Sequence, residues 1–352
     1  MMLGEPTFSV QPDHQAVRDD SLFLCFEEGR VLLRDTGGGT PALPTWAQVR
    51  PLPDGMEPFE LAHTDRFALF CPHPLHGGQV PERAGLRYYP LHIFRSLPYA
   101  EAGLLVSCWH LWAWYGRNRF CGRCAHPLVP DAAERALRCE GCGLVVYPAI
   151  APAVIVAITR GDSILLARSV RSTFRHYSLI SGYVEVGETL EHAVRREVME
   201  EVGLRLGALR YLGDQPWGVS GSQMFAFQAE ALDGGIRLQE SELSEARWFR
   251  RGELEPQGRT VSIALELIER FRAGTLRRAL TFQARHAIVL PFPRMLETKG
   301  RRRHDGRAGL RNRQYRFHPE HDQKGGRAGR RRADRGGAEP LRPADSAGRG
   351  AL

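Results

Sequence analysis

The chain has 352 residues, of which 43% are hydrophobic and 25% are charged, a composition ordinary for a soluble globular protein with a sizeable core. Its formal charge of +8 suggests nucleic-acid binding, but 16 Lys and Arg against 7 Asp and Glu lie between Leu296 and Leu352. The other residues hold 32 basic and 33 acidic side chains, so the total charge says little about the folded part.

Membrane and secretory classes are not favoured. The first residues, MMLGEPTFSVQPDH, contain neither the basic nor the apolar region of a signal peptide. The most apolar stretches, 104–116 and 151–158, are too short to span a bilayer. The sequence therefore predicts a soluble, cytoplasmic protein without a membrane partner.

Four segments follow one another along the chain. Residues 1–115 mix short apolar runs with Pro and Gly turns, which predicts a strand-rich domain. Residues 116–147 carry paired cysteines, and residues 148–275 alternate strand-like and helix-like patterns. Residues 276–352 are rich in Arg, Gly and Ala with little periodicity, which is typical of disorder. This basic tail is either an arm that attracts nucleic acid or a translated extension without function.

The third segment has the clearest periodicities. Its strongest patterns predict strands at 152–158, 162–169 and 223–232 and helices at 189–202 and 260–274. Arg160, Gly161 and Asp162 predict the turn between the first two strands, and Gly274 predicts the end of the last helix.

The paired cysteines form two C-x-x-C knuckles. Cys121 and Cys124 are separated from Cys139 and Cys142 by 14 residues, close to the spacing of four-cysteine zinc sites. Redox pairs or disulfides are the alternative, which the absence of a secretory signal makes less favourable. Four thiolates leave no open coordination position, so we expect a structural zinc ion.

Residues 182–204, GYVEVGETLEHAVRREVMEEVGL, are rich in glutamate. On the predicted helix, Glu197, Glu200 and Glu201 stand at i, i+3 and i+4 and project from one face. Three adjacent carboxylates repel one another unless a cation intervenes, and oxygen-only ligands suit Mg²⁺ or Mn²⁺. Because Mg²⁺ is usually shared with substrate phosphates, the helix predicts a phosphate-bearing substrate. The alternative is an ordinary solvated helix rich in Glu and Arg.

The surrounding pattern disfavours that alternative. Nine placed residues match G-x5-E-x7-R-E-U-x-E-E-x-G-U, where U is a bulky aliphatic: Gly182, Glu188, Arg196, Glu197, Val198, Glu200, Glu201, Gly203 and Leu204. The segment thus resembles the box of the Nudix hydrolases at every position.

This resemblance implies a fold and a set of roles. The fold class would be α+β: a Nudix α/β/α sandwich with an N-terminal strand-rich domain and a four-cysteine zinc ribbon. Glu197, Glu200 and Glu201 would be catalytic metal ligands, with Glu201 also the candidate base. Glu188 and Arg196 would form an ion pair that holds the loop, and Gly182 and Gly203 would be structural.

A ribbon directly before the box resembles the NADH pyrophosphatases, also known as NAD-capped RNA hydrolases. Residues 214–224, DQPWGVSGSQM, resemble that group's S-Q-P-W-P-F-P-x-S-x-M, with Gly218-Val219-Ser220 in place of Pro-Phe-Pro. The resemblance implies a further metal ligand, Glu242, for which Glu245 is a competitor. It also implies these substrate-binding residues: Tyr147, Tyr183, Gln215, Trp217, Ser222 and Ala264.

The function expected from this resemblance is Mg²⁺- or Mn²⁺-dependent hydrolysis of the pyrophosphate of NAD(H), giving AMP and a nicotinamide mononucleotide. NAD at the 5′ end of RNA would be a second substrate. The alternatives are a Nudix hydrolase of ADP-ribose or a diadenosine polyphosphate, or a non-catalytic RNA- or nucleotide-binding regulator. The resemblance further implies a homodimer.

Overall fold

A computed structural model describes residues 16–63, 68–76, 78–170, 176–233, 235–256 and 261–276. All of these fall within one compact unit, Met1–Arg294. The predicted disordered tail, apart from Leu276, lies outside the described residues. The division into four segments stays a prediction, and the elements are therefore described in chain order.

The described part of the first hundred residues contains two small sheets. One has the strand order β1-β5-β4 and the other the order β2-β3-β6. The elements are β1 (Leu22–Phe23), β2 (Phe26–Glu27), β3 (Arg30–Arg34), α1 (Trp46–Val49), β4 (Pro58–His63), β5 (Ala68–Pro72), β6 (Leu86–Pro90) and the 3₁₀ helix η1 (Leu91–Ser96). Strand β5 is buried along its whole length, which explains its unbroken apolar sequence ALFCP.

A long helix, α2 (Tyr99–Arg117), follows these strands and was not part of the strand-rich prediction. Leu105, Cys108 and Trp114 of this helix are buried in a core shared with β3 and β5. Apolar side chains occur around most of the helix, so the sequence shows no narrow apolar stripe of helical period. The 3.6-residue pattern that would have predicted α2 is therefore weak.

The paired-cysteine segment folds into a small three-stranded sheet of order β7-β8-β9. Its strands are β7 (Leu128–Pro130), β8 (Leu137–Cys139) and β9 (Val145–Val146), and all neighbours are antiparallel. Each strand is only two or three residues long. So small a sheet needs a further source of stability, such as a metal ion.

The remaining segment forms a six-stranded mixed sheet. Its strands are β10 (Ala151–Arg160), β11 (Ser163–Ser169), β12 (Ile180–Tyr183), β13 (Arg210–Trp217), β14 (Ser222–Glu230) and β15 (Leu243–Arg250). The order is β13-β14-β10-β11-β15, and β12 also pairs with β10. The predicted hairpin is confirmed, because Thr159 pairs with Ile164 and Arg160 with Ser163 around the turn.

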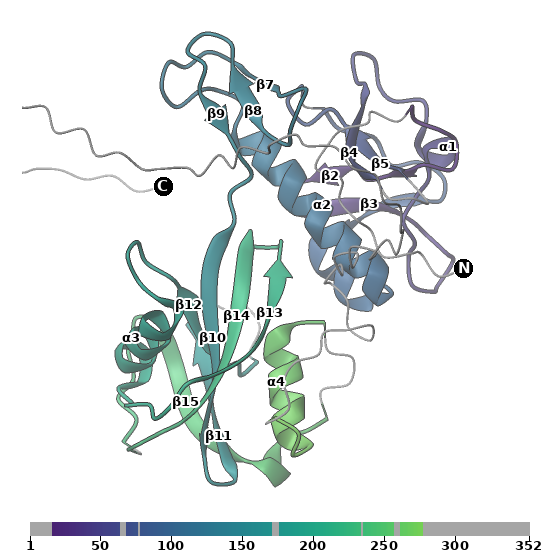
Figure 1. The fold of residues 1–352 in the computed structure, drawn as a ribbon. Coiled ribbons are helices and arrows are strands. Elements are labelled where there is room, and N and C mark those ends of the chain that lie inside the picture. The colour runs from purple at the N-terminus through teal and green to yellow at the C-terminus, as the bar shows by residue number, and fades with distance from the viewer. Residues whose placement is uncertain are drawn as a thin grey trace, which may run out of the picture. The chain divides into compact units, whose positions relative to one another are not determined.

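Two helices, α3 (Leu190–Val202) and α4 (Ile263–Arg272), cover opposite faces of this sheet (Figure 1). Residues 154, 156 and 158 of β10 share a core with α3, whereas Ile155 and Ala157 share a second core with α4. This alternation follows from the two-residue period of a strand buried on both faces. The structure therefore has the α/β/α sandwich that the sequence predicts.

Helix α3 begins and ends where the sequence predicts. The hydroxyl of Thr189 accepts a hydrogen bond from the backbone N–H of His192 at 3.1 Å. Gly203 closes the helix with φ of 68°, a left-handed conformation that favours glycine. These two caps fix the phase of α3 and thereby the direction in which its glutamates point.

The closing helix α4 is capped in a similar way by Ser262, and Gly274 follows it with φ of 71°. A single-turn 3₁₀ helix, η2 (Arg251–Glu253), precedes it. No helix in the described part of the chain is long and apolar enough to cross a membrane.

Candidate active site and zinc site

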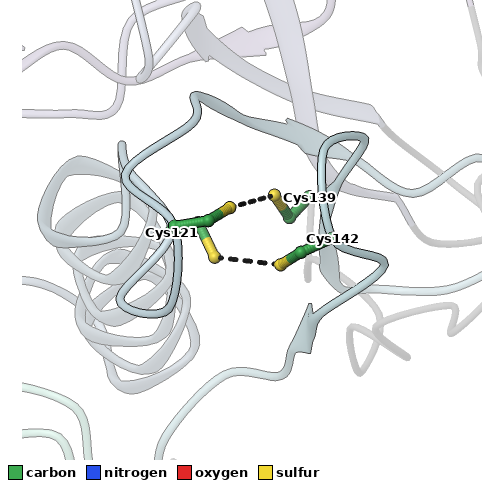
Figure 2. Close-up of side chains that lie close together, drawn as sticks. Cys121, Cys139 and Cys142 are labelled. Atoms are coloured by element: carbon green, nitrogen blue, oxygen red, sulfur yellow. Dashed lines mark hydrogen bonds between the residues drawn. The ribbon is translucent and has the colours of Figure 1, made fainter.

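The four predicted cysteine ligands converge on one point. The Sγ atom of Cys121 lies 3.6 Å from that of Cys142, and the Sγ atom of Cys124 lies 3.4 Å from that of Cys139. Figure 2 shows the side chains of the two knuckles pointing toward one another. All four sulfur atoms lie within 4.8 Å of one another, and none forms a disulfide.

This arrangement fits a tetrahedral zinc ion. Four thiolates at about 2.3 Å from zinc lie about 3.8 Å from one another, close to the observed sulfur separations. The two knuckles also turn alike, since the N–H groups of Ala125 and Gly143 donate to the carbonyls of Cys121 and Cys139. The protein thus supplies all four ligands, which is the property of a structural site.

At the second predicted site, Gly182 makes room for Glu197. A Cβ atom at position 182 would clash with the Glu197 carboxyl group. Gly182 pairs with Val154 of β10, so this contact joins α3 to the edge of β12. The first glycine of the box is therefore required by close packing, since its backbone conformation is not left-handed.

Arg196 forms ion pairs with three glutamates around α3. Its guanidinium donates two hydrogen bonds to the carboxylate of Glu188, at 2.7 and 2.9 Å. It also donates to Glu197 at 2.8 Å, to Glu200 at 3.0 Å and to the Tyr183 carbonyl at 2.9 Å. The bonds from Arg196 to Glu188 are the largest cause that holds the pKa of Glu188 down at about 2, and bonds from the Glu185 N–H and the His192 ring add to it.

Glu201 has a very different environment. Its residue is only 6% exposed, and no described residue donates a hydrogen bond to its carboxylate. Burial, together with the negative charges of Glu197, Glu242 and Glu200, raises its pKa to about 8. A buried carboxylate that faces three other acids and lacks a donor is a group that a cation would stabilise.

A cavity of about 660 Å³ opens beside these carboxylates. This volume suits a ligand of small-molecule size. Most of the predicted site residues line it: Gly182, Tyr183, Arg196, Glu197, Glu200, Glu201, Gln215, Trp217, Ser222, Glu242 and Ala264. Segments more than eighty residues apart in the sequence thus contribute to one concave site.

The two candidate metal ligands Glu242 and Glu245 have different surroundings in the structure. Glu242 lines the cavity and contributes to the raised pKa of Glu201, so its carboxylate belongs to the acidic group. Glu245 lies on β15 and pairs with Arg168 at 3.1 Å. Of the two competitors, Glu242 is the one that lines the cavity.

Of the predicted aromatic site residues, two line the cavity and one does not. Tyr183 and Trp217 line the cavity, and the Ser222 hydroxyl lies 3.4 Å from the Tyr183 hydroxyl. Tyr147 does not line the cavity of its own chain. Its ring is exposed, and its hydroxyl donates to Glu134 of the ribbon segment at 2.8 Å.

Gln215 lines the cavity, but its amide is occupied by the protein. Its Oε1 atom accepts from the N–H of Ile263 at 2.7 Å, and its Nε2 atom donates to the carbonyl of Val261 at 3.3 Å. The side chain is buried. Gln215 therefore anchors the start of α4, which carries Ala264 at the cavity wall.

Several cavity residues were not predicted from the sequence. They include Arg95, Glu185, Ser220, Gln239 and Ser262. Arg95 comes from η1, far from the box in the sequence, and no local motif marks it. Ser262 falls inside the helix predicted at 260–274, whereas the observed α4 begins at Ile263 with Ser262 as its cap. A serine before an apolar periodic run is a cap signal that could have given the correct start.

The carboxylates of the acidic group are not gathered as tightly as the cysteines. Within the described ranges, the four cysteines are the one set whose ligand atoms all lie within 4.8 Å. Glu197 and Glu200 are instead directed toward Arg196. The donor set nevertheless suits a hard divalent cation, because it consists of carboxylate oxygens around a buried, uncompensated Glu201.

Family comparisons agree with the geometry. The Nudix domain family matches residues 149–271, and the NADH pyrophosphatase zinc ribbon domain family matches residues 117–147. The chain belongs to the Nudix hydrolase family, with the zinc ribbon of the NADH pyrophosphatases before its Nudix domain. The fold class predicted from the sequence is thereby confirmed, and membership of the family implies a catalytic divalent metal.

Within the Nudix family, the chain is similar to several proteins that share one name. The chain is 42% identical over 193 residues to a protein of Pseudomonas syringae pv. tomato named NAD-capped RNA hydrolase NudC, covering 54% of this chain and 66% of that protein. A protein of the same name from Pasteurella multocida is 42% identical over 188 residues, covering 52% and 70%. A third, from Salmonella typhi, is 48% identical over 155 residues, covering 44% and 60%. The chain therefore spans about two thirds of the relatives that it matches.

A similar solved structure is more distant in sequence. A Nudix hydrolase from Nitrosomonas europaea is 21% identical, covers 44% of this chain and 90% of its own, and superposes with a TM-score of 0.38.

Proposed function

We propose that the protein is a Mg²⁺- or Mn²⁺-dependent hydrolase of the pyrophosphate bond of NAD(H), with AMP and a nicotinamide mononucleotide as products. NAD at the 5′ end of RNA is proposed as a second substrate, as the name of the relatives suggests. The observation that carries the proposal is the buried Glu201 carboxylate, which meets three other acids at the wall of a ligand-sized cavity.

The proposed metal ligands are Glu197, Glu200, Glu201 and Glu242. Divalent ions bound there would screen the diphosphate, orient it and lower the pKa of the attacking water. Binding requires Glu201 to be ionised and the carboxylates of Glu197 and Glu200 to be shared between Arg196 and the metal. Glu201 is also the candidate base, because its carboxylate lines the cavity beside the proposed metals and so can take a proton from a water bound there.

Other residues would position the substrate. Tyr183 and Trp217 offer aromatic faces on which the flat nicotinamide or adenine ring can stack, and Ser222 and Ala264 line the same cavity. Glu188 and Arg196 would hold the loop that precedes α3. We propose that Tyr147 acts from the second copy of a homodimer, since it lies outside the cavity of its own chain.

The test is product analysis by liquid chromatography and mass spectrometry. Purified protein with Mg²⁺ or Mn²⁺ is given NADH, NAD⁺, ADP-ribose and diadenosine polyphosphates. AMP plus reduced nicotinamide mononucleotide from NADH, lost by at least a hundredfold in Glu201→Gln, would support the proposal. The matched control is Glu191→Gln, an exposed glutamate of the same helix that does not line the cavity.

Turnover of ADP-ribose or a diadenosine substrate with NADH untouched would favour the alternative function. The sequence Gly218-Val219-Ser220 keeps this alternative in view, because the turn replaces Pro-Phe-Pro beside Trp217. Absence of turnover on every substrate with either metal would contradict an enzymatic function and favour a nucleotide-binding regulator.

A further inference from the structure

Two arginines line the cavity, and they differ in whether they pair with a carboxylate. Five glutamates line it, and Arg196 is hydrogen-bonded to Glu188, Glu197 and Glu200. Of the described residues, the other lining cation is Arg95, which is exposed. Among the residues that the structure describes, no carboxylate pairs with Arg95, whose guanidinium instead lies over the ring of Phe94. The cavity therefore offers one positive charge that no described acid neutralises.

Arg95 lines the cavity next to a residue that contacts its aromatic wall. Its neighbour Phe94 meets the ring of Trp217 edge-on, with centroids 5.6 Å apart. Trp217 pairs with Ser222, and Ser222 pairs with Ala151 of β10.

Gly182, against which Glu197 packs, pairs with Val154 on the same strand β10. Three residues along a strand, from Ala151 to Val154, correspond to about 10 Å. The backbone positions of β10 that pair toward Trp217 and toward Gly182 are thus about 10 Å apart.

The phosphates of the substrate limit what Arg95 can bind. A free NAD molecule has both of its phosphates in the diphosphate, which the metals at the acidic group would screen. A guanidinium next to the Phe94–Trp217 contact, with no described carboxylate partner, suits a further phosphate, because Arg forms charge-assisted, often bidentate bonds with phosphate oxygens. In an NAD-capped RNA, the adenosine continues into a phosphodiester that the free dinucleotide lacks.

We propose that Arg95 binds the RNA backbone phosphate that follows the NAD cap, and so determines preference for capped RNA over free NAD. This inference rests on the proposed function. Exposure of Arg95 is consistent with the role, since an RNA chain must leave the cavity toward solvent. The residue acts on substrate selection and takes no part in the bond cleavage.

The experiment compares kcat/KM for NAD⁺, NADP⁺ and a short NAD-capped RNA in the full-length chain with metal. Arg95→Gln is expected to lower the ratio of capped-RNA to NAD⁺ kcat/KM about tenfold, mainly through KM, as loss of one charged contact does. Arg95→Lys should recover most of that ratio, because it restores the charge. The slope of log kcat/KM against log salt for capped RNA should fall by about 0.7 in Arg95→Gln. Arg117→Gln, which changes an exposed arginine of α2 outside the cavity, is the matched control.

The possible results separate the inference from the function. An equal loss on NAD⁺ and capped RNA would overturn the inference, since Arg95 would then serve the dinucleotide itself. A loss confined to NADP⁺, or no loss at all, would also overturn it. Wild-type turnover of NAD⁺ without capped RNA would overturn the inference and leave NAD(H) hydrolysis standing, whereas turnover of neither would overturn both.

Discussion

At the scale of single residues, the ion pair of Glu188 and Arg196 makes a pH-dependent contribution to stability. The pKa of Glu188 is lowered from 4.5 to about 2 in the folded chain. Because the folded-state value is depressed, the contribution is present above pH 4.5 and is lost as the pH falls toward 2. We expect Glu188→Gln to lower Tm at pH 7, with the difference from wild type closing between pH 4.5 and 2.

Thermal unfolding across pH 2 to 7 measures this effect. Glu191→Gln is the control, because Glu191 is exposed on the same helix and no described arginine is bonded to it. A Tm difference that stays constant with pH would contradict the prediction, since it would show that the ionised state of Glu188 is not what stabilises the loop.

Gln215 gives a second prediction at this scale. Gln215→Ala leaves the Ile263 N–H and the Val261 carbonyl without their side-chain partner. An unsatisfied buried group costs about 1–3 kcal/mol, and we expect unfolding in urea to show a loss of this size. Because the start of α4 would then be less fixed at the cavity wall, we also expect KM for the substrate to rise more than kcat falls.

Gln223→Ala is the matched control for Gln215. Gln223 also uses its amide, donating to Asp214 at 2.7 Å, but it does not line the cavity. A rise in KM of the same size in both variants would contradict a positioning role for Gln215. Partial recovery in Gln215→Glu would support it, because the glutamate can still accept from Ile263.

At the scale of secondary-structure elements, the sequence predicted those helix ends and turns that adjacent residues determine. Thr189 and Gly203 supply the cap and the left-handed end of α3, so the helix and the direction of its glutamates follow from adjacent residues. The hairpin of β10 and β11 likewise follows from two apolar runs around Gly161. Helix α2 was missed because its apolar residues are distributed around it, and its burial depends on strands distant in the sequence.

The zinc ribbon gives the prediction at this scale. Its strands are two or three residues long, so we expect the bound metal to contribute most of the stability of residues 117–147. Removing zinc with a strong chelator should raise amide hydrogen exchange in β7, β8 and β9 by at least tenfold. The amides of β10 and β14, at the centre of the large sheet, should stay protected.

Addition of zinc to the chelated protein should restore the protection, which separates metal loss from irreversible damage. Equal exchange in β7–β9 with and without chelator, at a zinc content shown to be near zero, would contradict a structural role. The cysteine sulfurs would then have to be held by the surrounding core alone, which includes Cys121 and Cys139.

At the scale of the whole molecule, the cavity combines residues that no local pattern connects. The box predicted the glutamates of α3, but Arg95 and the contact of Phe94 with Trp217 depend on long-range packing. Gly218 is a further example. A Cβ atom there would clash with the Val106 carbonyl of α2, which gives a packing reason for glycine in the turn that departs from Pro-Phe-Pro. The departure from Pro-Phe-Pro is visible in the sequence, but the contact with Val106 that explains it depends on the fold.

The net charge of the molecule gives the last prediction. Residues 277–352 hold 20 basic and 7 acidic side chains, so a chain that ends at Leu276 changes from +8 to −5. Leu276 must be kept because it is buried against the core of α4. Every described cavity residue precedes Leu276, so NAD⁺ turnover should stay within about twofold of wild type. RNA affinity should fall, because an anionic protein repels a polyanion. Binding of uncapped and capped RNA across a salt series measures this, and the difference between the two chains should vanish at high salt. If affinity and its salt dependence are the same in both chains, the tail has no part in RNA binding and the extension is dispensable.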